Sequence, residues 1–181
     1  MEKITSAEKN KMAAINGLLV GIIYIVITSA VNLMVNDMIY FYLLKFVGYM
    51  LYFVIIGYFA SQIKKANGGF IEFREIFGAI FIMVLIASTI AYVYTYIYMY
   101  YIDPHYMEKI KAATIHFMEK MNTPADKIDE TSRKFDDQLA ESKKFGLGKN
   151  LLTLLGAFVV DSLFGLIVAA IVRRKRPENL A

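Results

Sequence analysis

The chain has 181 residues, of which 57% are hydrophobic, and it contains no cysteine. So much apolar surface cannot be buried inside one small soluble domain, and the lack of cysteine excludes disulfide bonds, thiolate nucleophiles and cysteine-ligated metal sites. The formal net charge is +4, but the cationic residues flank apolar runs, which is typical of membrane topology signals and not of a nucleic-acid surface.

Four uninterrupted apolar runs dominate the sequence, at residues 12–35, 38–63, 76–102 and 151–172. An α-helix rises about 1.5 Å per residue, so each run is long enough to cross a hydrocarbon core of ~30 Å. The prediction is an all-α polytopic membrane protein with four transmembrane helices that contact the lipid bilayer. Its four helices form a single membrane domain over 1–181.

The first run carries a close-packing face. Gly17 and Gly21 are one helical turn apart, and the face continues to Asn32. This spacing suits packing within the bundle as readily as dimerisation, so a homo-oligomer is an open alternative. A cleavable signal peptide is the other interpretation of this run, but its apolar character continues to Val35, well beyond the ~7–15 residue core of a signal sequence.

Cations beside the ends of the runs indicate the orientation. Lys64-Lys65 and the basic cluster at 173–176 adjoin ends on one side, whereas Asp37 and Asp103 flank ends on the other side. The positive-inside rule then predicts an inner-membrane protein with both termini in the cytoplasm.

The segment 103–149 is predicted to be an extracytoplasmic helical hairpin. Asp103-Pro104 and Thr123-Pro124 are helix-start signals. Apolar residues then recur every three to four positions in two narrow stripes: Tyr106, Ile110, Ala113, Phe117 and Met121, and Ile128, Phe135 and Leu139. Packing of one stripe on the other is the plain interpretation, and docking of a protein partner on this segment is the alternative.

Asp161 is the candidate functional residue, because a carboxylate about a dozen residues into the fourth run is costly unless it is paired, protonated or facing water. Ala157, Gly165 and Ala169 share its helix face and predict close helix packing there. Lys45 in the second run has a similar depth, so an intramembrane Asp161–Lys45 pair is expected. Asn32, a tyrosine hydroxyl or water are the alternative partners of the acid.

The order of motifs resembles a known family. Asn67-Gly68-Gly69-Phe70-Ile71-x-Phe73 precedes the third run, Asp103-Pro104-x-x-Met107-Glu108 follows it, and Asp161-x-x-x-Gly165-Leu166-Ile167 lies in the last run. This arrangement is similar to that of the small four-helix bacterial membrane proteins catalogued as domain of unknown function 4199. The resemblance covers nearly the whole chain and implies an integral membrane protein without an established activity.

Catalytic chemistry finds little support in the sequence. It has no glycine-rich phosphate loop and no Ser-His-Asp set, and His105 and His116 are too far apart along a helix to share a metal ion. We therefore expect no enzyme, no cofactor, no metal and no nucleic-acid partner. The predicted role is a non-enzymatic accessory or interaction subunit, and the alternative is a small transporter or channel component that uses Asp161 and Lys45.

Overall fold

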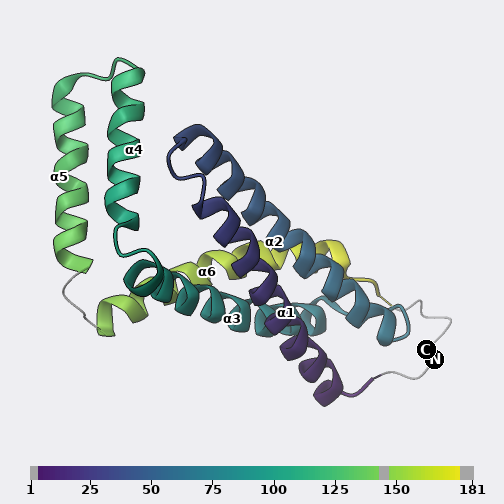
Figure 1. Ribbon diagram of the computed structural model, residues 1–181. Coiled ribbons are helices and arrows are strands. Elements are labelled where there is room, and N and C mark those ends of the chain that lie inside the picture. Colours follow the sequence, from purple (N-terminus) through teal and green to yellow (C-terminus); the bar gives the residue numbers. More distant parts are fainter. Residues whose placement is uncertain (1–3, 143–146, 176–181) are drawn as a thin grey trace.

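The computed structural model describes residues 4–142 and 147–175. These residues form six α-helices: α1 (Ser6–Asn32), α2 (Met38–Ala66), α3 (Phe73–Ile97), α4 (Tyr106–Lys120), α5 (Ala125–Ser142) and α6 (Leu147–Val172). A π-helical turn, η1 (Tyr98–Ile102), continues α3. Figure 1 shows a bundle of four long helices with the α4–α5 pair standing beside one end of it. The prediction of an all-α fold is confirmed.

Four helices are long and apolar enough to cross a membrane: Ser6–Asn32, Met38–Ala66, Phe73–Ile102 and Leu152–Val172. They coincide with the four predicted runs. The first helix begins earlier than the apolar run, because Thr5 and Glu8 form a capping box in which Thr5 Oγ1 accepts from the Glu8 backbone N–H at 3.2 Å. The polar cap thus starts the helix at Ser6, whereas the apolar run alone begins at residue 12.

The third long helix is the centre of the bundle, since α3 packs against α1, α2 and α6. Its inward face consists of fully buried residues: Ile76, Ile80, Met83, Val84 and Ala87. Burial of each large side chain contributes roughly 1.5–3 kcal/mol wherever the surrounding medium is water, and close packing takes over that role where the surroundings are apolar.

Small residues allow the neighbouring helices to approach α3 closely. A Cβ added at Gly17 would lie 3.0 Å from the Met83 Cα atom, and one added at Gly21 would lie 2.9 Å from Ile90 Cδ1. A Cβ at Gly165 of α6 would lie 3.1 Å from Ile80 Cγ2. The glycine face of α1 is therefore turned toward α3 inside the bundle.

Basic residues gather where α1 and α3 begin and α2 and α6 end. The loop after α2 turns through Gly68 and Gly69, whose φ angles of 78° and 86° suit glycine. Ile71 and Arg174 then exchange two backbone hydrogen bonds of 2.8 and 3.0 Å, which join this loop to the segment after α6. At the same end Lys9 Nζ lies 2.7 Å from Glu75 Oε1.

Helices α4 and α5 lie side by side and are joined by a short turn in which Asn122 has a φ of 54°. Lys111 Nζ of α4 lies 2.6 Å from Asp136 Oδ1 of α5. The 121–124 turn points away from the bundle in Figure 1.

The apolar stripe of α4 packs on the bundle, whereas the prediction paired it with the stripe of α5. Tyr106, Ile110, Ala113 and Phe117 join one apolar cluster with residues at the α1–α2 turn: Val31, Val35, Met38 and Phe41. Met121, assigned to the same stripe, is 63% exposed. The prediction was wrong because a stripe shows that a face is buried without showing which surface covers it.

Candidate functional site

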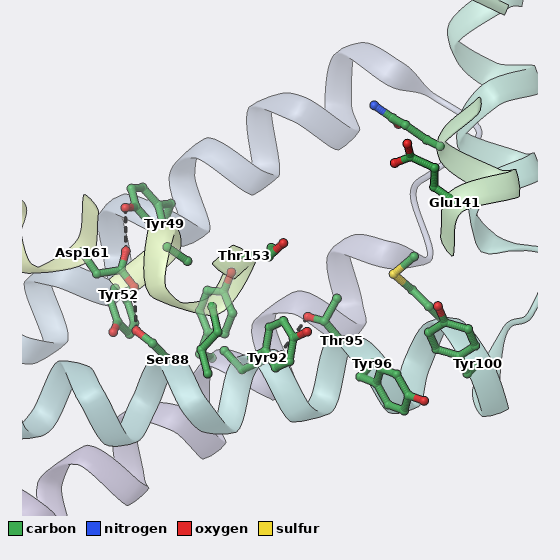
Figure 2. Close-up of a pocket in the computed structure, with 16 residues that line it drawn as sticks. Tyr49, Tyr52, Ser88, Tyr92, Thr95, Tyr96, Tyr100, Glu141, Thr153 and Asp161 are labelled. Atoms are coloured by element: carbon green, nitrogen blue, oxygen red, sulfur yellow. Dashed lines mark hydrogen bonds between the residues drawn. The ribbon is translucent and has the colours of Figure 1, made fainter. Parts of the chain in front are cut away.

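Asp161 is held by two hydroxyl groups from two other helices. Tyr49 Oη of α2 donates to Asp161 Oδ1 at 2.8 Å, and Ser88 Oγ of α3 donates to Asp161 Oδ2 at 2.7 Å. Figure 2 shows the three side chains converging, with the carboxylate between its donors. One hydroxyl on each oxygen is an arrangement that an ionised carboxylate accepts.

Packing on either side of Asp161 fixes this geometry. Gly165 and Ala169, one and two turns further along α6, are buried in the bundle. The Phe164 ring stacks on Phe53 with centroids 5.0 Å apart and meets Tyr49 edge to face at 5.7 Å. These contacts set the rotation of α6 so that Asp161 faces α2 and α3. Ala157, predicted to belong to the same packing face, is exposed and lines a cavity.

A cavity of about 490 Å³ extends from Asp161 toward the hairpin. Half of its polar lining residues are tyrosines, from four elements of the fold: Tyr24, Tyr49, Tyr52, Tyr92, Tyr96 and Tyr100. Figure 2 shows Asp161 at one end of the row of side chains and Glu141 of α5 at the other. Within the described lining there are two carboxylates and no lysine or arginine. The cavity is therefore an aromatic chamber that ends at the Asp161 carboxylate.

Tyr52 contributes a further polar group next to the acid. Its ring meets Tyr24 edge to face at 5.5 Å and stacks with Tyr49 at 6.4 Å. Its hydroxyl is buried beside Ser88 and has no hydrogen-bond partner among the described residues. A buried hydroxyl of this kind costs roughly 1–3 kcal/mol unless something bonds to it.

Lys45 lies in a separate cluster with Asn32. Lys45 Nζ donates to Tyr106 Oη over 3.5 Å, and Tyr106 Oη donates to Asn32 Oδ1 at 2.8 Å. The lysine ammonium also lies 4.4 Å from the centre of the Phe41 ring. Burial raises the pKa of the Tyr106 hydroxyl above its usual range, which keeps this phenol neutral and able to donate.

The structure thus does not join Asp161 to Lys45, and the predicted pair is incorrect. Each group has its own hydroxyl partners: Tyr49 and Ser88 for the acid, Tyr106 for the lysine. Equal depth along two helices fixes height but not rotation about the helix axes, and rotation separates these two residues. The alternative of a tyrosine hydroxyl as the partner of the acid describes what is found.

Tyr49 and Ser88 were not anticipated as site residues. A signal for Ser88 exists in the sequence, since it follows the apolar Ile80 and Val84 at spacings of four and so shares their buried face. Tyr49 has no comparable signal, because tyrosines recur throughout the apolar runs. Asn32, by contrast, is buried and hydrogen-bonded as a polar residue in an apolar helix should be.

No curated protein and no solved structure matches the chain significantly. A family model does match, over residues 15–174, which run from within α1 through the end of α6. The chain therefore belongs to the family described as "Protein of unknown function (DUF4199)".

Proposed function

We propose that this integral membrane protein binds a small organic ammonium ion in the cavity that ends at Asp161, and that it acts by binding and not by catalysis. The observation that carries the proposal is Asp161, a carboxylate that lies among apolar helices at one end of a tyrosine-lined cavity. Such a carboxylate is costly without a compensating charge, and its partners among the described residues are two neutral hydroxyl donors. A bound cation would supply that charge.

The tyrosine walls favour an organic cation over a bare metal ion. Tyrosine rings attract an ammonium group through their faces, by about 0.5–1 kcal/mol at exposed sites and ~2 kcal/mol when water is excluded. Tyr24, Tyr49 and Tyr52 line the cavity, and the Tyr52 ring contacts both the Tyr24 ring and the Tyr49 ring.

Binding of a cation at Asp161 fits a non-enzymatic accessory subunit. It also fits a transporter component that uses Asp161 without Lys45. Both functions begin with cation binding, so one binding measurement tests the step that they share. The binding cavity also reaches the hairpin, through Gln138 and Glu141 of α5. A ligand in the cavity would therefore contact α5, which we propose to lie outside the membrane.

Binding of tetramethylammonium to the purified protein in nanodiscs tests the proposal. Isothermal titration calorimetry at constant ionic strength should detect binding, and Asp161→Asn, which keeps the shape of the side chain, should weaken the affinity at least tenfold. Asp137→Asn on the exposed face of α5 is the matched control and should leave the affinity unchanged. Equal affinity in the wild-type and Asp161→Asn proteins, with both folded by circular dichroism, would refute the proposal. Equal heats for potassium would exclude the organic cation as the preferred ligand.

We also propose that both termini are cytoplasmic and that the hairpin is extracytoplasmic, in the inner membrane. Clustering of Lys9, Lys64-Lys65, Arg74 and 173–175 where α1 and α3 begin and α2 and α6 end supports this orientation. Because the chain lacks cysteine, Ser6→Cys and Asp129→Cys each introduce a single reactive thiol at an exposed position. In intact spheroplasts a membrane-impermeant maleimide should label position 129 and not position 6. The reverse pattern would invert the topology.

A further inference from the structure

A second cavity, of about 430 Å³, surrounds Lys45 and has the opposite electrostatic character. Its polar lining consists of donors or neutral hydroxyls from four helices and η1: Tyr24, Thr28, Asn32, Tyr42, Lys45, Tyr49, Thr95, Tyr98 and Tyr106. No aspartate or glutamate is present in the part of the lining that the structure describes. The first cavity is thus lined by the carboxyl groups of Asp161 and Glu141, and the second is lined by the ammonium group of Lys45.

The ammonium group of Lys45 has hydrogen-bonding capacity to spare. It has three N–H donors, and the structure assigns one to Tyr106 Oη, over a long 3.5 Å. No described carboxylate lies within ion-pair distance of Lys45. The side-chain carbonyl oxygen of Asn32 accepts the hydrogen bond from Tyr106, so its amide N–H₂ group is a second donor in the cavity. The two donors suit an anion with several oxygen atoms.

The position of the cavity indicates where such an anion comes from. Lys45 is seven residues from the start of α2, or about 10 Å along the helix axis, and its long side chain can reach the headgroup level of a bilayer. Beside it Tyr42 and Phe46, which line the cavity, are 56% and 62% exposed on the outer surface of α2. In a membrane protein this surface faces lipid, so the cavity opens sideways onto acyl chains. A charged headgroup and its chains could therefore enter together.

We propose that Lys45, with Asn32 and Tyr106, binds the phosphate group of an anionic phospholipid whose acyl chains lie along α2. The phosphate completes the hydrogen bonding of the ammonium and compensates its charge. Tyr106 belongs to α4, so the headgroup contacts both the bundle and the hairpin. The two cavities share Tyr24, Tyr49, Thr95 and Met99, but the residues that would bind the phosphate, Lys45, Asn32 and Tyr106, do not line the first cavity.

Delipidated protein in neutral detergent, supplied with phosphatidylglycerol, phosphatidylcholine or inorganic phosphate, tests the lipid site. Phosphatidylglycerol should raise the melting temperature of the wild type by several degrees and remain bound in native mass spectrometry. Phosphatidylcholine and inorganic phosphate should each give less than a third of that shift. Protection of the same size by phosphatidylcholine would refute recognition of net negative charge, and the same protection by inorganic phosphate would refute a lipid as the occupant.

Variants at the two ends of α2 separate the site from general charge effects. Lys45→Met should reduce retained phosphatidylglycerol at least fivefold and remove most of the thermal shift. Lys65→Met, an exposed lysine near the opposite end of the same helix, should behave as the wild type does. Lys45→Arg preserves the charge and should retain at least half of the lipid, which shows that a loss in Lys45→Met is not misfolding. Equal losses in Lys45→Met and Lys65→Met, or lipid retained in full by Lys45→Met, would overturn the proposal.

Discussion

Replacing Lys9 with methionine should lower the free energy of unfolding by about 3 kcal/mol, the range found when one partner of a buried ion pair is removed. Lys9 Nζ lies 2.7 Å from Glu75 Oε1, and the two side chains are only 7% and 26% exposed. The pair links the first turns of α1 and α3, the two helices that the glycine face holds together. Without the ammonium, Glu75 loses the charged hydrogen bond from Lys9 in a poorly solvated position.

Thermal or denaturant unfolding in detergent measures this effect, with two comparisons. Lys11→Met removes an exposed cation two residues away on the same helix and should leave stability unchanged. The double variant Lys9→Met with Glu75→Gln should recover part of the loss, because it removes both charges. Simple additivity of the two single changes would show that the pair contributes no coupling.

Phe117→Asp should detach the hairpin from the bundle at a cost of up to about 3 kcal/mol. The Phe117 side chain packs on the apolar cluster at the α1–α2 turn, together with Val35, Met38 and Phe41, so a carboxylate there would be desolvated. Hydrogen exchange followed by mass spectrometry should report faster exchange across α4 and the α1–α2 turn, while the centre of α3 stays protected.

Met121→Asp is the matched control for Phe117→Asp. It places the same charge four residues later, at the C-cap of α4, where the side chain is already exposed, and should not change exchange. Phe135→Asp on α5 should loosen α5 from α4 and leave α4 attached to the α1–α2 turn. If Phe117→Asp and Phe135→Asp exposed the same segments equally, the hairpin would be a unit held by its own two stripes, as the sequence alone suggested.

The four apolar helices were predictable because helix length and apolar content follow from short-range sequence alone. Their ends were less so, since Thr5 and Glu8 extend α1 through side-chain capping outside the apolar run. The need of Asp161 for partners was also predictable, because a carboxylate in an apolar helix must be compensated. These inferences require only one helix at a time.

The partners themselves depend on how separate helices are rotated against one another. Asp161 and Lys45 have similar depths, yet Gly165 packing on Ile80 turns Asp161 toward Ser88 and Tyr49. Lys45 is turned toward Tyr106, a residue beyond the third run. Periodicity gives the faces of each helix, but it cannot say which face meets which neighbour.

The hydroxyl partners of Asp161 have a consequence for biosynthesis. Asp161 is 112 residues after Tyr49 and 73 residues after Ser88, so both hydroxyls emerge from the ribosome well before their acceptor. Chains are made and folded from the N-terminus onward, and contacts between distant segments form late. Helices α1 to α3 therefore enter the membrane before α6 covers its contact surface on α2 and α3, and the fold is complete when α6 packs there. A nascent chain arrested before residue 161 would expose this contact surface to insertion factors and quality-control proteases.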